Sequence, residues 1–265
     1  MTHKPKPIRE REARPAAPAA HERPDGRSAH ALRPLKIERG TLPHAEGSAL
    51  IAMGRTRVLC TATVEDRVPP FLKGSGRGWV TAEYGMLPRA TQERTTRDSQ
   101  RGGRAQEIQR LIGRSLRAVT DLTAFGERTI LMDCDVLEAD GGTRTAAING
   151  AMVALHDAFL VLSNRRQLLK PPLRDLVAAV SVGLCDGAPC LDLAYAEDAK
   201  AQVDMNVVMT AGGRYVEVQG TGESATFSDA ELRLLLRLAA RGVQKVVSVQ
   251  RRMLGDSGLV PAPSA

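Results

Sequence analysis

The sequence predicts a single domain of mixed α/β class (α+β), and three observations lead to this prediction. Strand-like runs rich in β-branched residues are interspersed with segments whose apolar residues recur at helical spacing. The chain has 265 residues, which is enough to bury a substantial core. The sequence contains no internal repeat at a fixed period, so a repeat architecture is not expected.

The first half of the chain supplies most of the predicted strands. Short apolar and β-branched runs, separated by glycine, proline and polar residues, predict strands over 35–38, 49–52, 57–64, 79–84 and 129–137. A helix over 105–123 is predicted between the last two, because Ile108, Leu111 and Ile112 begin an apolar series at helical spacing.

The second half is expected to hold a helix, two hairpins and a long final helix. The hairpins turn at Asp186-Gly187 and at 211–213, where glycine favours a tight turn. Ser228 and Glu231 form a capping box, which predicts the start of the final helix. The full set is a helix over 146–162, hairpins over 177–193 and 204–219, and a helix from 228 to about 254.

The chain divides into three parts. Residues 1–22 are basic and rich in proline and alanine, without the apolar stretch of a signal peptide, which predicts a disordered leader. The domain is expected over 23–254, and 255–265 is expected to be a short flexible tail. We find no run long enough to span a membrane and expect a soluble, cytoplasmic protein without a membrane partner.

The composition of the chain indicates which binding partners and which catalytic groups are expected. A net charge of +7 favours a polyanion, while only 3% aromatic residues argue against base stacking as the main mode of nucleic-acid binding. The four cysteines lack zinc-finger or redox spacing and are expected to be reduced structural thiols. The five histidines form no cluster and no Gly-x-Ser-x-Gly string occurs, so neither a histidine base nor a serine nucleophile is favoured.

Two segments place paired glycines and an arginine at a predicted helix start. They are Gly102-Gly103-Arg104 and the string Gly-Gly-Thr-Arg at 141–144. A helix start offers free N–H groups and a positive dipole end, and arginine adds a fork that matches phosphate oxygens. Either segment alone could equally be an ordinary turn, but the two together favour an anion site. Neither matches the Walker A pattern, so an ordinary P-loop nucleotidase is not expected.

An acidic pair supplies a candidate metal site. Asp198 and Asp204 are six residues apart and could flank a turn so that both carboxylates face one Mg²⁺. On spacing alone, two surface aspartates are the more common arrangement. Four other acidic residues compete for the role: Asp192, Glu197, Asp133 and Asp135.

A basic loop is the third candidate. The polar segment between 88 and 103 carries Arg89, Arg94, Arg97 and Arg101 with few acidic residues. A run of charge is usually only a solvated surface. Here the arginines lie among turn residues, and contact with a polyphosphate backbone is a reasonable hypothesis.

Several longer strings along the chain are far more specific than a spacing motif. The first is Arg-Pro-Asp-Gly-Arg at 23–27, and the others are 36–48, 78–89, 107–114, 133–145, 204–210 and 217–221. Together they resemble the bacterial ribonuclease PH family, phosphate-dependent 3′-exoribonucleases related to polynucleotide phosphorylase and to the ring subunits of the exosome. The resemblance runs from Arg23 to about Leu254.

The resemblance implies a fold, an assembly and site residues. The fold would be similar to the second domain of ribosomal protein S5, with two sheets, helices between them and a left-handed βαβ crossover, assembled as a homohexameric ring of three dimers. Inorganic phosphate, as co-substrate, would be bound by Arg104, Gly142, Thr143 and Arg144. Asp198 and Asp204 would be the catalytic residues that hold Mg²⁺, and RNA would be guided by Arg89, Arg94 and Arg97.

The implied activity is phosphorolytic 3′→5′ exoribonuclease, a reversible nucleotidyltransferase. It would trim the 3′ end of precursor tRNA, degrade structured RNA such as rRNA, and release nucleoside diphosphates. One alternative is a catalytically inactive RNA-binding ring subunit of an exosome-like assembly, but such subunits lack arginine or aspartate positions that are present here. A second alternative is a hydrolytic nuclease, which predicts nucleoside monophosphates and needs no phosphate.

Overall fold

The computed structural model describes residues 23–97, 102–255 and 257–259. The leader predicted over 1–22 lies outside the described residues, as do Arg101 and much of the predicted tail. Within 255–265, Ser257 Oγ lies 2.7 Å from His156 Nε2 and Leu259 is buried, so this described part of the tail is attached to the body.

The first sheet has five strands in the order β1-β2-β3-β5-β4. The strands are β1 Leu35–Arg39, β2 Gly47–Met53, β3 Thr56–Glu65, β4 Trp79–Met86 and β5 Thr129–Glu138. All neighbours are antiparallel except β4 and β5, which are parallel and joined through helix α1, Gly103–Ala118. This unit is the βαβ crossover implied above; its left-handed sense stays a prediction.

The second sheet has four antiparallel strands in the order β7-β6-β8-β9. They are β6 Val177–Cys185, β7 Ala188–Leu191, β8 Val203–Thr210 and β9 Tyr215–Gly222. Both predicted hairpins are confirmed. At the first turn Asp186 and Gly187 have φ values of 50° and 74°, the left-handed geometry of a tight hairpin.

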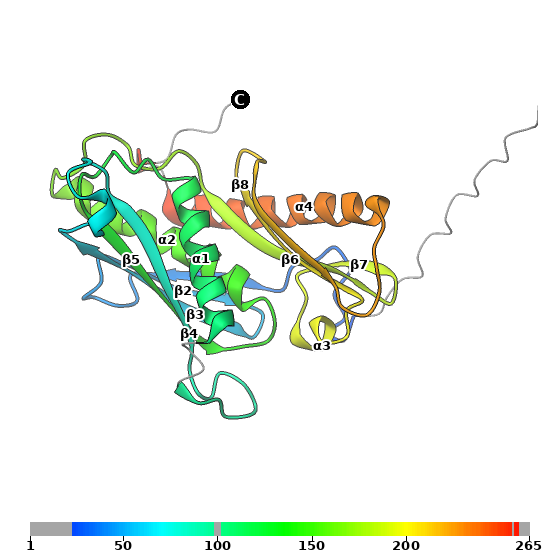
Figure 1. Cartoon of the computed structure of the whole chain (residues 1–265). Helices are drawn as coiled ribbons and strands as arrows, with labels where there is room; N and C mark the ends of the chain where they lie inside the picture. Colours follow the sequence, from blue (N-terminus) through cyan, green and yellow to red (C-terminus); the bar gives the residue numbers. More distant parts are fainter. Residues whose placement is uncertain (1–22, 98–101, 256, 260–265) are drawn as a thin grey trace, which may run out of the picture.

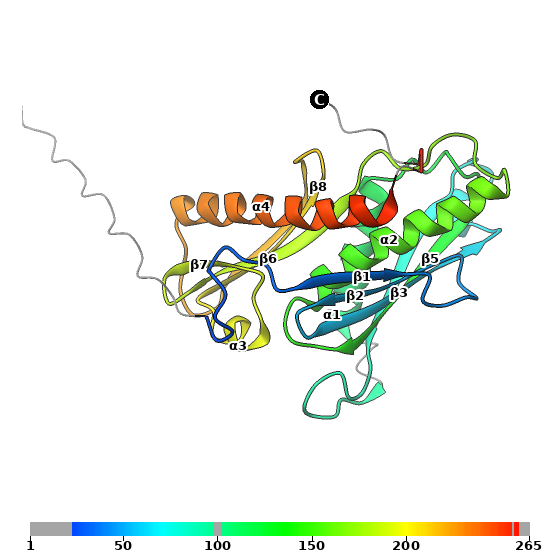
Figure 2. The same ribbon diagram turned by 180° about the vertical axis from the view of Figure 1, so that it is seen from behind.

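Helices separate and cover the two sheets (Figures 1 and 2). Helix α2, Thr143–Asn164, packs on β2 and β3 of the first sheet and on β6 of the second. Helix α4, Asp229–Leu254, packs on β6, β7 and β8, and starts at the predicted Ser228–Glu231 capping box. The short helix α3, Tyr195–Asp198, was not predicted, and η1, Pro70–Leu72, is a single 3-10 turn. The mixed α/β class is therefore confirmed.

Two helix boundaries differ from the prediction. Helix α1 ends at Ala118, not near residue 123, because the following backbone pairs elsewhere: the N–H of Arg174 donates to the carbonyl of Val119. Helix α2 begins at Thr143, three residues early, because Gly142 caps it in the left-handed region with φ 66°. Thr143 and Arg144 therefore lie in the first turn of the helix.

One expectation about apolar runs is corrected. Within the described residues, α2 is long and apolar enough to cross a membrane by length and composition, with a mean hydropathy of 1.5. However, 83% of that stretch is buried inside the fold, as expected of a core helix placed between two sheets. The four cysteines are buried and free, as predicted.

Candidate active site

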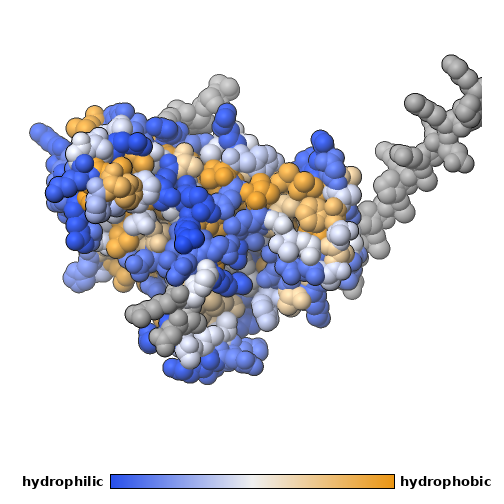
Figure 3. Space-filling model, in the orientation of Figure 1, coloured by the Kyte–Doolittle hydropathy of each residue, from blue (hydrophilic) through white to orange (hydrophobic). Residues whose placement is uncertain are grey.

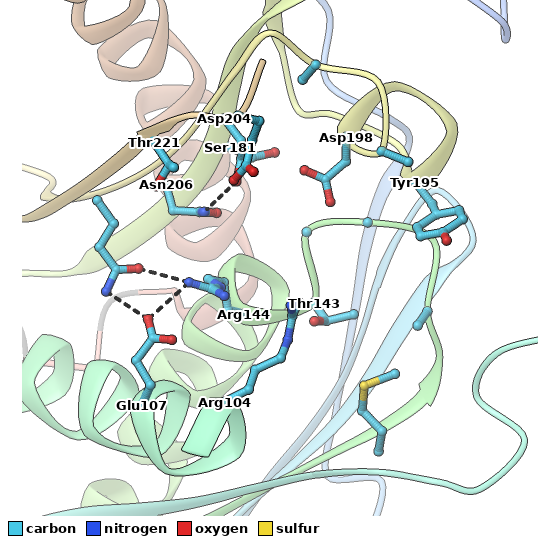
Figure 4. A pocket seen from close by; sticks show the side chains of 18 of the residues that line it. Arg104, Glu107, Thr143, Arg144, Ser181, Tyr195, Asp198, Asp204, Asn206 and Thr221 are labelled. Atoms are coloured by element: carbon cyan, nitrogen blue, oxygen red, sulfur yellow. Dashed lines mark hydrogen bonds and ion pairs between the residues drawn. The ribbon is translucent and has the colours of Figure 1, made fainter. Parts of the chain in front are cut away.

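A cavity of about 700 Å³ lies where the two sheets meet the starts of α1 and α2. Most of its polar lining comes from α1, α2, β8 and β9 and from the short α3 (Figure 4). The polar lining includes Arg104, Glu107, Thr143, Arg144, Ser181, Tyr195, Asp198, Asp204, Asn206, Gln219, Thr221 and Glu223. The predicted phosphate-binding and catalytic residues are thus brought together in one place.

The Gly141–Gly142 turn needs its glycines. Both residues have positive φ, 75° and 66°, which L side chains rarely adopt. A Cβ at Gly141 would lie 2.7 Å from the carbonyl oxygen of Leu193, so the turn also runs close to another backbone segment. No side chain caps the start of α2, so the N–H groups of its first turn stay available to a ligand in the cavity.

Arg104 reaches the cavity from the first turn of α1. Figure 4 shows its side chain extending from α1 toward Thr143 at the start of α2. The hydroxyl of Tyr84 donates to Thr143 Oγ1 over 2.8 Å and fixes that side chain. Burial raises the pKa of Tyr84, which stays a neutral donor, while the positive charges of Arg104 and Arg144 act on it in the opposite sense. Two helix starts and two guanidinium groups therefore face one space.

Arg144 is held by side chains from two other elements. Its Nη1 donates to Gln219 Oε1 over 2.9 Å and to Glu107 Oε1 over 3.3 Å. Gln219 in turn donates to Glu107 Oε1 and to Glu217 Oε1. These bonds leave the rest of the guanidinium group for an anion in the cavity.

Asp198 and Asp204 lie on the opposite wall of the cavity, as Figure 4 shows. Burial raises the pKa of both carboxyl groups; for Asp204 the neighbouring charge of Asp198 adds to the effect and brings the pKa to about 6. Asn206 donates to Asp204 Oδ2 over 3.4 Å, whereas Asp204 Oδ1 is buried without a hydrogen-bond partner.

This donor set fits a magnesium ion that keeps other ligands. Mg²⁺ prefers one or two carboxylates completed by water and substrate phosphate oxygens. Asp198 and Asp204 supply two, and the unpartnered Asp204 Oδ1 lacks only a cation or a donor. Among the described residues, no three His, Cys, Asp or Glu side chains are grouped so that they could hold a metal ion. Water and substrate oxygens would therefore complete the coordination of an ion at Asp198 and Asp204.

Of the four competing acidic residues, two are held in buried ion pairs and two lie outside the cavity. Asp192 is fully buried and its Oδ1 lies 2.7 Å from Arg33 Nη2. Glu197 is buried against Arg23, whose Nε lies 2.6 Å from Glu197 Oε1. Both arginines are far away in sequence, so spacing could not reveal these ion pairs. Asp133 and Asp135, on β5, do not line the cavity.

The arginines of the basic loop do not line the cavity. Arg89, Arg94 and Arg97 are all exposed, and of this loop Thr91 lines the cavity. In Figure 1 the loop after β4 projects from the lower edge of the molecule.

Several cavity residues were not predicted from the sequence. Glu107 and Gln219 hold Arg144, and Ser181 and Tyr195 line the wall near Asp198 and Asp204. Their signal was weak: Glu107 is one turn from Arg104 on a predicted helix, and Gln219 lies at the end of a predicted strand. Glu107 and Gln219 can both bind Arg144 only because the fold brings β9 close to α1 and α2.

Comparisons with known proteins agree with this architecture. Residues 31–160 match the family model "3' exoribonuclease family, domain 1", and residues 175–242 match "3' exoribonuclease family, domain 2". Among solved structures, rice (Oryza sativa) Rrp46 is 22% identical with a TM-score of 0.71, covering 88% of this chain and 100% of that one.

Two archaeal structures are similar to the same extent. An archaeal exosome core chain is 20% identical, with a TM-score of 0.70, covering 88% of this chain and 92% of that one. A chain of the Archaeoglobus fulgidus exosome with RNA bound to the active site is 20% identical, with a TM-score of 0.71, covering 86% and 92%. These likenesses confirm the ribonuclease PH-type fold. With both of its domain models matched along one chain, the protein belongs to the 3′ exoribonuclease (RNase PH) family.

Proposed function

We propose that this protein is a phosphorolytic 3′→5′ exoribonuclease that uses inorganic phosphate as its nucleophile. The observation that carries the proposal is the convergence of Arg104, the Gly142–Arg144 helix start, Asp198 and Asp204 on one cavity. A positively charged wall faces a carboxylate wall across a space large enough for a phosphate and a terminal nucleotide.

The reaction exchanges one bond to phosphorus for another. An oxygen of inorganic phosphate attacks the last phosphodiester and forms a P–O–P bond, while the bond from phosphorus to the penultimate 3′ oxygen breaks. The proton of the attacking phosphate goes to that 3′ oxygen, and the products are a nucleoside diphosphate and a shortened RNA. Because the two bonds are of comparable energy, the reaction runs backwards with nucleoside diphosphates.

This chain's residues hold the reactants in line. The fork of Arg104 and the free N–H groups at the start of α2 orient the phosphate, and Arg144 neutralises its charge. Asp198 and Asp204 would hold Mg²⁺. A metal bound there would supply positive charge to the oxygens of the scissile phosphate.

RNA is the substrate class, with precursor tRNA 3′ ends as the proposed physiological target and structured RNA such as rRNA as a further one. Arg89, Arg94 and Arg97 are exposed on the same loop as Thr91, which lines the cavity, and this supports a role for them in binding RNA phosphates upstream of the 3′ end. We place the reaction in the cytoplasm.

A homohexameric ring is the proposed assembly. Strand β9 lies at the edge of the second sheet, and exposed apolar side chains lie on it and on α4: Tyr215, Val218 and Leu234. Figure 3 shows hydrophobic residues gathered over the second sheet and α4 on this face. An open edge with apolar neighbours favours contact with another copy.

An inactive RNA-binding ring subunit is the alternative, and one incubation separates it from the proposal. RNA labelled at its 3′ nucleotide is incubated with the protein and Mg²⁺, with and without inorganic phosphate. The proposal predicts labelled nucleoside diphosphate only when phosphate is present, and no product from Asp204→Ala. Binding without turnover would support the inactive subunit, and monophosphate products would support a hydrolase.

A further inference from the structure

We propose that the buried Arg33–Asp192 ion pair positions the phosphate-binding turn, so that it controls phosphate affinity as well as stability. The inference rests on the proposed function, because it concerns the turn that would bind the attacking phosphate. Neither residue lines the cavity. Both are therefore positioning residues that act through the backbone of 140–142.

Arg33 binds the turn and its anchor at the same time. Its Nη1 donates to the carbonyl of Asp140, and its Nη2 donates to the carbonyl of Gly141 over 3.3 Å. Its Nε and Nη2 also donate to the two carboxylate oxygens of Asp192, over 3.1 and 2.7 Å. The rigid fork of arginine can make all four bonds, whereas the single ammonium of lysine cannot reach them together.

The burial and backbone conformation of Asp192 hold its carboxylate against Arg33. It is fully buried, and its backbone has φ 58°, a left-handed conformation that is uncommon for a residue other than glycine. Its Oδ2 also accepts from the backbone N–H of Arg33 over 2.7 Å. Strained backbone of this kind persists where the surroundings fix it, and it is frequent at functional sites.

Thr56 holds the same turn from a second direction. Its hydroxyl donates to the carbonyl of Gly141 over 2.7 Å and accepts from the N–H of Asp140 over 2.9 Å. Thr56 is fully buried at the start of β3. The two residues before the cap of α2 are therefore fixed by one arginine and one hydroxyl, which together aim Gly142 and Thr143 at the cavity.

A second bidentate ion pair, far from the phosphate turn, offers a control. Arg39 on β1 donates through Nε and Nη2 to the two carboxylate oxygens of Asp157 on α2, over 3.1 and 2.5 Å. Breaking this partly buried pair should cost stability, because it leaves one charge without its partner. Neither residue lines the cavity or contacts Asp140 or Gly141, so the backbone of the turn should stay in place.

The test is direct binding of inorganic phosphate, measured by calorimetry on the full chain, together with thermal unfolding. We expect Arg33→Lys and Asp192→Asn to weaken phosphate binding by about tenfold or more, and Thr56→Val by a smaller factor, since bonds to a charged group are the stronger ones. Asp157→Asn should stay within about twofold of the wild type in phosphate affinity while it lowers the melting temperature.

Phosphate affinity that follows melting temperature equally in all four variants would overturn the inference, as would unchanged affinity in Arg33→Lys and Thr56→Val. Thr56→Val introduces no unpaired charge, so it keeps the test decisive should the ion-pair variants fail to fold. A wild-type protein that binds no phosphate would instead refute the proposed function, and the inference with it.

Discussion

Arg144 Nη1 donates to Gln219 Oε1 over 2.9 Å, a bond that joins the first turn of α2 to strand β9 across the wall of the cavity. Glu107, on α1, accepts from both residues. Because three elements share these bonds, the guanidinium group is oriented before any ligand binds. Preorganised charge of this kind is what stabilises a developing negative charge most effectively.

Gln219→Leu tests this orientation. Without the Gln219 acceptor, Arg144 loses its best bond, and we expect the KM for phosphate to rise by about threefold to tenfold while kcat changes less. Gln244→Leu is the control, because Gln244 donates to the carbonyl of Ala211 at the turn of the β8–β9 hairpin and neither residue lines the cavity. Equal effects of the two changes would mean that the Gln219 bond is not specific to the site.

Arg104→Ala removes a proposed phosphate ligand. We expect kcat/KM for phosphorolysis to fall by about a hundredfold or more, the usual effect of losing one charged stabiliser of a transition state. Arg110→Ala is the matched control, since Arg110 is exposed on the same helix and does not line the cavity. A rate close to the wild type in Arg104→Ala would remove Arg104 from the mechanism.

Gly142→Ala and Gly103→Ala form a second matched pair. Gly142 has φ 66°, and a Cβ there would lie 3.0 Å from Arg33 Nη2, so alanine should destabilise the fold by about 1–2 kcal/mol and weaken phosphate binding. Gly103 begins α1 with open space around it, so alanine there should be neutral or stabilise by up to about 1 kcal/mol. Chemical denaturation curves measure both. A neutral Gly142→Ala would contradict the strained conformation of the turn.

Asp204→Asn tests how the stability of the folded protein depends on pH. The pKa of Asp204 is raised from 3.8 to about 6 by burial and by Asp198. The folded state therefore holds this proton more tightly, so the carboxyl favours folding most below about pH 4 and loses that contribution as the pH rises through about 6. At pH 7 the loss is about 3 kcal/mol.

Asparagine stays neutral, so Asp204→Asn should unfold at a higher temperature than the wild type at pH 7.5 without metal. The difference should shrink as the pH falls toward 4. Added Mg²⁺ should stabilise the wild type and not the variant. A melting difference that does not change with pH would contradict the raised pKa.

The exposed arginines of the basic loop should affect the binding of RNA and not the binding of phosphate. Changing Arg89, Arg94 and Arg97 together to Ala should weaken RNA binding and reduce the slope of log K against log salt by about 0.7 for each RNA phosphate that the protein no longer neutralises. Phosphate affinity, measured without RNA, should not change. Anisotropy titrations of a labelled single strand at several salt concentrations give the slope, and an unchanged slope would place the RNA path elsewhere.

The sequence predicted turns and helix starts well where the residues that define them are close together in the chain. The paired glycines at 141–142, the Asp186-Gly187 turn and the Ser228–Glu231 capping box each reflect a local steric or hydrogen-bonding requirement. The predicted end of α1 was wrong because a distant segment, 172–174, pairs with the backbone that would have extended the helix. Tertiary pairing of this kind leaves no local pattern.

The same distinction between local signals and long-range contacts applies to the residues of the site. Arg104 and Arg144 were predicted because each follows glycines at a helix start. Short spacing only made Asp198 and Asp204 candidates, and the family resemblance singled them out. Asp192 looked like an equal candidate until the fold placed Arg33, 159 residues away in sequence, against both of its oxygens. Spacing alone therefore could not separate ligand carboxylates from structural ones.

The most direct test of the central claim follows the phosphate itself. Unlabelled RNA is incubated with the protein, Mg²⁺ and ³²P-labelled inorganic phosphate, and the products are separated. We expect the label to appear as the β-phosphate of nucleoside diphosphates, at a rate that Arg104→Ala abolishes. Label that stays in inorganic phosphate while the RNA shortens to nucleoside monophosphates would contradict phosphorolysis.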